Sequence, residues 1–175
     1  MKEIFGEETK KKKAGIRLVR EELFKIVFGV EATESTSEEL EKHVALAVRA
    51  LDNTIDLTVT PLKESNKHNL LYRTIGVGAM GLADYLAREY MIYEDSINEI
   101  NELFERIALY SVKSSALLAK ERGAYKAFKG SKWDQGIFFG KKREWYEENS
   151  KFKDEWNEDF YLVEANGLRN GALTA

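Results

Sequence analysis

The chain has 175 residues, of which 43% are hydrophobic and 33% charged, a composition typical of a globular protein with one sizeable core. Its formal net charge of −3 gives no electrostatic basis for binding nucleic acid or an anionic membrane. The absence of cysteine excludes disulfides, thiolate zinc sites and thiol chemistry on this chain. No apolar run approaches the roughly 20 residues of a membrane span. The first residues also lack the apolar core of a signal peptide, so we expect a cytoplasmic protein.

Residues 1–35 indicate a basic tail followed by one helix. Four lysines stand at Lys10–Lys13, and such a run is typical of a solvated tail, although it could also contact phosphate. Apolar residues then recur at helical spacing until Gly29, which predicts a helix; they are Ile16, Val19, Leu23, Ile26 and Val27. A polar connection follows at Glu31–Ser37.

Two capping boxes mark the starts of the strongest helical patterns. Thr36-Ser-Glu-Glu39 precedes one apolar stripe, and the predicted helix ends on the approach to Pro61. The stripe consists of Leu40, Val44, Ala47, Val48, Leu51 and Ile55. Ser96-Ile-Asn-Glu99 opens the longest pattern, which runs to Arg122 and a terminal Gly123. Apolar residues on a second face of this helix predict that it is covered on more than one side.

Between these helices we expect a polar loop at Lys63–Asn69, a buried strand at Leu70–Val77 and a helix at Leu82–Tyr90. The strand assignment depends on a short apolar stretch that is bounded by loop signals.

Beyond Gly123, the glycines and aromatic residues of Ala124–Gly140 indicate a loop. Trp145–Val163 is predicted to be a helix that Asn166-Gly167 terminates. Leu168–Ala175 resembles the opening of a strand.

Gly76, Gly78 and Gly81 match the G-x-G-x-x-G pattern of dinucleotide-binding enzymes. A Rossmann unit also needs a strand before the glycines, a helix after them and a second strand that ends in an acid. Tyr90–Tyr93 could be that second strand, with Glu94 or Asp95 as its acid. Arg73 and Thr74 argue against this interpretation, because a buried parallel strand is usually apolar. The alternative is structural: the glycines let a strand turn sharply into a closely packed helix.

No catalytic, cofactor-binding or metal-binding residue is assigned from the sequence. His43 and His68 are the only histidines, and neither belongs to a metal-binding spacing. The chain has no G-x-S-x-G nucleophile elbow and no identifiable acid/base pair. Aromatic residues gather at Trp133, Trp145, Tyr146 and Trp156. Such residues more typically pack in a core or an interface than stack on bases.

Five stretches, taken in order, together resemble the large catalytic subunit of class I ribonucleotide reductase. The two most specific are Arg73-Thr-Ile-Gly-Val-Gly-Ala-Met-Gly-Leu-Ala-Asp-Tyr-Leu86 and Leu168-Arg-Asn-Gly-Ala-Leu-Thr174. The full set is 44–56, 72–87, 115–125, 130–137 and 166–175, and it covers most of the chain from about residue 40 onward.

The resemblance implies a fold class: a mostly helical α/β segment of a ten-stranded α/β barrel, with about two barrel strands and their packing helices. Residues 36–175 would form this segment, and residues 1–35 remain an unplaced tail and helix. Arg73–Val77 and Asn170–Ala175 would be the barrel strands. The glycines would then lie at a turn from strand to helix.

The resemblance also implies ribonucleoside-diphosphate reductase activity, which supplies deoxyribonucleotides for DNA replication. The family uses a cysteine thiyl radical and a redox pair of cysteines upstream of the matched region, and its substrate-phosphate loop begins just beyond it. We therefore expect a scaffold that is inactive alone and binds no cofactor. The complete enzyme would need a radical-generating partner and a thiol reductant.

The expected partners are the remaining parts of the large subunit and, in the full complex, a small radical-generating subunit. Exposed strand edges and an uncovered apolar face would favour association, including homo-oligomers. The chain would be either one piece of a naturally split subunit or an excised segment. Two other functions stay open: an NAD- or NADP-binding module, and a helical interaction protein without an enzymatic context.

Overall fold

The computed structural model describes residues 37–89 and 91–173, which belong to two compact units. The larger unit contains residues 37–79 and 101–173 of this described part, and the smaller contains residues 80–89 and 91–100. The basic tail, the first predicted helix and the Thr36 cap lie outside the described residues.

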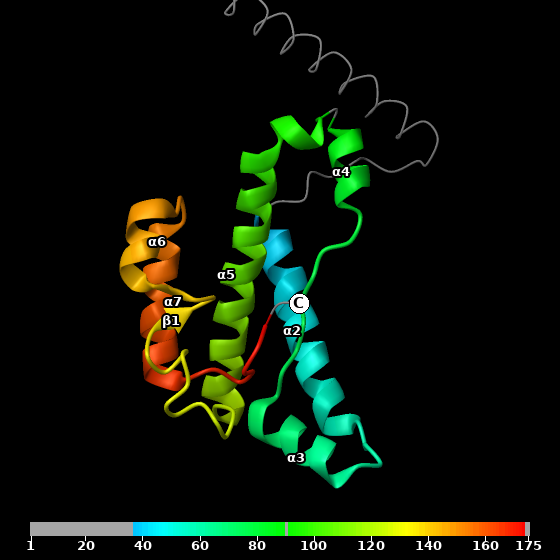
Figure 1. Ribbon diagram of the computed structural model, residues 1–175, viewed down its shortest axis with the longest axis vertical. Coiled ribbons are helices and arrows are strands. Elements are labelled where there is room, and N and C mark those ends of the chain that lie inside the picture. The colour runs from blue at the N-terminus through cyan, green and yellow to red at the C-terminus, as the bar shows by residue number, and fades with distance from the viewer. Residues whose placement is uncertain (1–36, 90, 174–175) are drawn as a thin grey trace, which may run out of the picture. The chain divides into compact units, whose positions relative to one another are not determined.

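The larger unit is organised around α5 (Ile97–Arg122), of which residues 101–122 lie in this unit. This helix lies between α2 (Ser37–Leu57) and the pair formed by α6 (Arg143–Asn149) and α7 (Lys153–Asn166), as Figure 1 shows. Its apolar residues are buried on several faces, as the sequence predicted, and Ser111, Ser114 and Ser115 are buried as well. The core joins residues of all these helices and of the C-terminal segment; its most buried members include Val48, Val112, Phe138, Trp156, Val163, Leu168 and Leu173.

The predicted stripe of α2 faces this core. Val44 and Val48 are buried. Glu38 and Glu39 lie in the first turn, where carboxylates interact favourably with the positive end of the helix dipole. Asp52 continues the same face at the next i+4 position and is completely buried. The helix therefore places a carboxylate in the middle of the core.

The predicted loop at Lys63–Asn69 and the start of the predicted strand at Leu70 are wrong, because α3 (Lys63–Tyr72) occupies both. This sequence is polar, but it has no proline or glycine to interrupt a helix once Pro61 and Leu62 have opened it. The helix ends at Arg73, which adopts the left-handed conformation with φ 46°. Its N–H donates to the carbonyl of Asn69.

The two barrel strands expected from the resemblance are not assigned as strands. Residues 74–77 and 170–173 have no regular secondary structure, although Ile75 and Val77 donate backbone hydrogen bonds to Ala172 and Leu173, at 3.0 and 2.9 Å. Among the described residues, the regular sheet is the hairpin of β1 (Ile137–Phe138) and β2 (Lys141–Lys142). The structure is thus mostly helical, with a small antiparallel sheet where a loop was expected.

The single helix predicted at Trp145–Val163 is two helices. After α6, Ser150 adopts an extended conformation, and its hydroxyl donates to a carboxylate oxygen of Glu105 at 2.5 Å. The same hydroxyl accepts the N–H of Phe152, so it satisfies a backbone donor as α7 starts. The terminator predicted at Asn166-Gly167 is confirmed, since Gly167 follows α7 with φ 72°.

The smaller unit contains α4 (Leu82–Arg88), the short 3-10 helix η1 (Tyr93–Asp95) and the first turn of α5. Gly81 precedes α4 in the left-handed conformation, φ 81°, which glycine adopts without steric cost. Leu86 is its buried residue, and the N–H of Met91 donates to the Leu86 carbonyl.

Candidate functional site

Among the described residues of the larger unit, the buried carboxylate of Asp52 is the centre of a polar network. Its Oδ1 accepts a hydrogen bond of 2.9 Å from Nε of Arg73, and its main-chain carbonyl accepts another of 3.0 Å from Nη2. Asp56, one turn further along α2, completes a fork by accepting from both Nη atoms at 2.7 and 2.9 Å. Arg73 is 4% exposed, so α2 holds this guanidinium away from water.

Asn170 connects this pair to the C-terminal segment. Its side-chain amide donates to Oδ1 of Asp52 and to the carbonyl of Arg73, both at 3.1 Å. Its amide oxygen accepts the hydroxyl of Ser115 on α5 at 3.0 Å, and the same hydroxyl accepts the backbone N–H of Asn170. Both side chains are completely buried, and every polar atom of the Asn170 side chain is used.

Two further arginines approach the second oxygen of Asp52. Nη1 of Arg122 lies 3.2 Å from Oδ2, and Nε of Arg169 lies 3.3 Å from it. Arg169 also donates to the main-chain carbonyls of Arg122 and Gly123, which satisfies acceptors at the C-terminal end of α5. We call Asp52, Asp56, Arg73, Ser115, Arg122, Arg169 and Asn170 the Asp52 cluster.

The interactions within the cluster favour the charged forms of Arg73 and Asp56. Burial alone would lower the pKa of Arg73, but its hydrogen bonds to Asp56 and Asp52 hold that pKa above its ordinary value. The hydrogen bond from Arg73 likewise lowers the pKa of Asp56. The buried carboxylate of Asp52 and the half-exposed carboxylate of Asp56 are both paired with Arg73, so neither is a free acid or base for proton transfer. Its chemistry is that of a structural clamp between α2, α5 and two chain segments.

The local backbone brings these side chains together. The left-handed conformation of Arg73 is unusual for a residue with a side chain, and the hydrogen bonds of its guanidinium hold it there. The adjacent carbonyl of Tyr72 accepts the N–H of Gly171 at 2.7 Å. A Cβ on Gly171 would lie 2.6 Å from that oxygen, so only glycine permits this approach.

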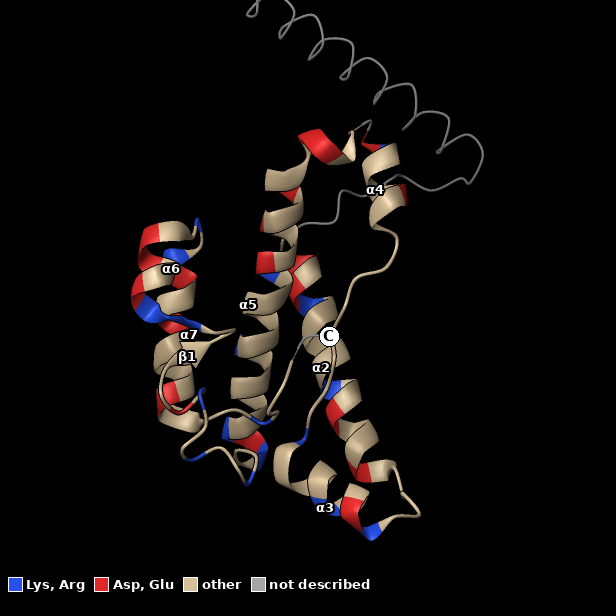
Figure 2. Cartoon of the chain, viewed as in Figure 1, with Lys and Arg blue, Asp and Glu red and all other residues tan. Residues whose placement is uncertain are grey.

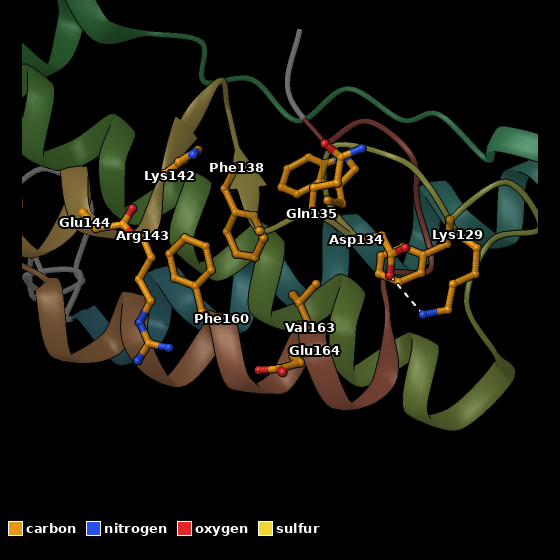
Figure 3. A pocket seen from close by; sticks show the side chains of 13 residues that line it. Lys129, Asp134, Gln135, Phe138, Lys142, Arg143, Glu144, Phe160, Val163 and Glu164 are labelled. Atoms are coloured by element: carbon orange, nitrogen blue, oxygen red, sulfur yellow. Dashed lines mark hydrogen bonds and ion pairs between the residues drawn. The ribbon is translucent and has the colours of Figure 1, made fainter.

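A cavity of about 600 Å³ lies beside the hairpin (Figure 3). Phe138 and Phe160 form its apolar wall, with ring centroids 4.0 Å apart. Its charged lining is balanced, because it contains Lys129, Lys142 and Arg143 together with Asp134, Glu144 and Glu164. Histidine and hydroxyl side chains do not line it, and its ionisable groups are these carboxylates, lysines and arginine, of which Lys129 and Asp134 form an ion pair.

Asp159 on α7 is a second buried carboxyl group, and its Oδ2 has no hydrogen-bond partner among the described residues. Burial raises its pKa to about 8, an effect that Lys113 opposes and that Glu158, Glu41 and Glu155 reinforce. The group is therefore protonated near neutral pH. It lies 2% exposed in the core, where no substrate can reach it.

The two histidines lie outside the Asp52 cluster and the cavity, whereas Trp133 of the aromatic set lines the cavity. His43 and His68 are exposed, and no cluster of metal-binding side chains occurs in residues 37–89 and 91–173. Tyr146 and Trp156 are buried in the core, as packing residues should be, and Trp133 donates its indole N–H to the carbonyl of Gly171. Trp145 is exposed beneath the amine of Lys141.

The glycine motif does not form a Rossmann site within the described residues. Residues 74–77 before it are not a strand, and the helix after it has seven residues. Gly78 is not among the glycines with positive φ, and a Cβ there would meet open space. Gly81 supplies the left-handed turn into α4. Gly81 thus supplies a turn into a helix, but the strand that the turn interpretation also required is not found in residues 74–77, and the arrangement does not favour a dinucleotide.

Sequence reasoning missed the Asp52 cluster, although signals for it were present. Asp52 follows Val44 and Val48 at i+4 spacing, so a charged residue stood in line with a core stripe. Arg73 lies in an otherwise apolar stretch, and above it served only as an argument against a buried parallel strand. If both Asp52 and Arg73 are buried, they are expected to form an ion pair, because an unpaired charge is not tolerated in a core.

Acidic and basic residues are interspersed along the helices of the larger unit (Figure 2). Within the described part of the chain, helices long and apolar enough for a membrane span are not found.

Residues 8–175 match the family model described as "Ribonucleotide reductase, barrel domain". The match starts nearer the N-terminus than the five stretches that carried the resemblance. Among curated proteins, the ribonucleoside-diphosphate reductase subunit alpha of a Synechocystis species is 47% identical over 131 residues, which are 74% of this chain and 17% of the relative.

Two further relatives carry the same name. The protein from Helicobacter pylori is 37% identical over 151 residues, 81% of this chain and 19% of that protein. The one from Chlamydia muridarum is 34% identical over 151 residues, 79% of this chain and 14% of that protein. The chain thus spans less than a fifth of the length of these relatives.

Proposed function

Because this chain belongs to the ribonucleotide reductase barrel-domain family, we propose that it is a scaffold segment of a ribonucleoside-diphosphate reductase large subunit. Its work is to hold chain segments in place within an enzyme that reduces ribonucleotides to deoxyribonucleotides. The cysteines that the family needs for this reduction are absent here, so the chain alone is inactive.

The Asp52 cluster is the observation that carries this proposal. It fixes the segment after α3 and the C-terminal segment against α2 and α5 through charged groups that are all paired. A site built for catalysis would leave a nucleophile, an acid or a base accessible to substrate. The cluster instead gives a rigid connection between segments far apart in the sequence.

The proposal extends to partners and surroundings. The partners are the remaining parts of the large subunit and, in the complete complex, a small radical-generating subunit. A thiol reductant would supply the electrons. We place the assembly in the cytoplasm, and we treat residues 36–175 as the barrel segment.

Sedimentation tests the association on which the proposal depends. Chain 1–175 is mixed with the polypeptides that carry the rest of the large subunit from the same organism. We expect a stable complex with one copy of each part. Failure of the parts to associate at micromolar concentrations would contradict the proposal.

Calorimetry with NAD and NADP distinguishes the dinucleotide alternative. The short α4 and the absence of a strand before the glycines lead us to expect no binding heat from either nucleotide. Saturable heat that disappears in a Gly81→Ala variant would support the alternative instead.

A further inference from the structure

The cavity beside the hairpin contains charged groups that the larger unit leaves without partners. Lys129 and Asp134 of its lining pair with each other at 3.0 Å. Lys142, Glu144 and Glu164 also line it, and their side chains form no hydrogen bond or ion pair with another described residue. The volume of about 600 Å³ is in the range of small-molecule sites. The cavity therefore has room for a ligand, and it has charges of both signs to bind one.

Arg143, the first residue of α6, is held in a fixed orientation at this cavity. Its Nε donates to the side-chain oxygen of Asn157 at 2.7 Å, and its guanidinium carbon lies 4.3 Å from the ring centroid of Tyr161. Glu147 lies 3.4 Å from the same Nε. The two terminal nitrogens donate no hydrogen bond to any residue that the structure describes. A planar fork that is fixed at one edge and free at the other matches the two oxygens of a carboxylate.

The carboxylate of Glu164 lies near this fork. In the view of Figure 3, the charged ends of Arg143 and Glu164 both lie below Phe160 and Val163. Phe160 and Val163 are buried, and the partly buried ring of Trp133 also lines the cavity. A ligand at this place thus meets a cation, a carboxylate and an apolar, largely aromatic surface.

The balance of unpaired charges determines which ligand fits. Glu144 and Glu164 would repel a ligand that carries only negative charge. Arg143 and Lys142 would repel one that carries only positive charge. A zwitterion satisfies both sets, because each of its charged groups finds the opposite charge.

We propose that this cavity binds a free α-amino acid with an aromatic side chain. The carboxylate of the ligand accepts from the terminal nitrogens of Arg143, its ammonium group donates to Glu164, and its ring packs on the aromatic lining. This binding site goes beyond the scaffold role and does not depend on it.

L-phenylalanine is the probe, titrated into chain 1–175 and followed by two-dimensional NMR of the backbone amide groups. Three analogues each lack one feature: phenylpropionate lacks the ammonium group, phenethylamine lacks the carboxylate, and L-alanine lacks the ring. We expect saturable shifts with L-phenylalanine at the residues of the cavity. Each analogue should bind about tenfold more weakly or less, because a charge-assisted hydrogen bond or the ring contact is lost.

Two variants test the assigned groups. Arg143→Gln removes the fork, and Glu164→Gln removes an exposed carboxylate that holds nothing else among the described residues. Glu158→Gln is the matched control, because Glu158 is an exposed residue of α7 that does not line the cavity. Circular dichroism first confirms that the variants keep the helix content of the parent chain. We expect L-phenylalanine to bind about tenfold more weakly to the first two variants and equally well to the control.

Three results would overturn the proposal. The first is the absence of saturable shifts up to about 10 mM L-phenylalanine, a concentration at which even a weak specific site is occupied. The second is an analogue that binds as tightly as L-phenylalanine, since the site then does not recognise the missing group. The third is unchanged binding in Glu164→Gln. These results leave the proposed function untouched, because that function is tested by association with the other parts of the subunit.

Discussion

The Nε atom of Arg73 lies 2.9 Å from Oδ1 of Asp52, and both side chains are sealed from water in the core of the larger unit. A buried ion pair brings little net stability compared with apolar residues, but the loss of one partner leaves an uncompensated charge. The fold therefore needs both side chains to be present and correctly placed. The carboxylate and the main-chain carbonyl of Asp52 both accept from Arg73, so Asp52 helps to hold the Arg73 side chain in place.

Asp52→Asn tests this requirement, because it removes the charge and retains the shape. We expect the free energy of unfolding to fall by about 3 kcal/mol, at the lower end of the cost of breaking a buried ion pair, since the half-exposed Asp56 still pairs with Arg73. Urea denaturation measured by circular dichroism provides the value.

Glu121→Gln is the matched control for that variant. Glu121 forms a 2.7 Å ion pair with Arg49, but both side chains are about half exposed, so solvent screens the interaction. We expect no resolvable change in stability. Equal effects from the two substitutions would show that burial does not give the Asp52 pair its importance.

Gly171→Ala tests the close contact between the C-terminal segment and the end of α3. The added Cβ would lie 2.6 Å from the carbonyl oxygen of Tyr72, and that oxygen is itself held by the N–H of residue 171. We expect a loss of about 1–3 kcal/mol in thermal or urea unfolding, the usual cost of overpacking. Gly78→Ala has open space for its Cβ and should stay within about 0.5 kcal/mol of the parent. A larger loss at Gly78 than at Gly171 would contradict the described geometry.

Asp159 predicts a pH dependence of stability. Burial raises its pKa to about 8 in the folded chain, whereas an unfolded aspartate titrates near 4. Between these values the folded state holds a proton that the unfolded state has released. Its contribution to the free energy of unfolding therefore falls by about 1.4 kcal/mol per pH unit as the pH rises from about 4 to 8, and is constant above.

Asp159→Asn removes this titration and keeps the size of the side chain. Urea unfolding of both proteins between pH 5 and 9 should show the variant gaining stability relative to the parent as the pH rises. Parallel curves for the two proteins would mean that Asp159 ionises normally in the folded state.

Hydrophobic periodicity predicted the helices that pack along one stripe or more. Val44 and Val48 in α2, and the many buried residues of α5, are regularly spaced, so the pattern is visible without the partner. It failed for α3, which buries no residue and therefore carries no stripe. The break at Ser150 was also missed, because its contact with Glu105 joins residues 45 positions apart.

The candidate site was harder to predict, because its members come from four separate segments. Asp52 and Asn170 are 118 residues apart, and nothing local in either indicates the other. The sequence pattern predicted strands at Leu70–Val77 and Leu168–Ala175, and the resemblance placed barrel strands at Arg73–Val77 and Asn170–Ala175. Within the described residues these segments share few backbone hydrogen bonds, and regular strands need repeated pairing with neighbours.

The most direct measurement is thiol-dependent conversion of a ribonucleotide to its deoxyribonucleotide by the reconstituted enzyme, with and without this chain. The mixture contains the remaining large-subunit polypeptides, the radical-generating subunit and a thiol reductant. We predict that neither this chain nor the other components reduce the substrate separately, and that the complete mixture does. Full activity without chain 1–175, or no activity from a complex that sedimentation shows to be assembled, would contradict its role as a scaffold of the reductase.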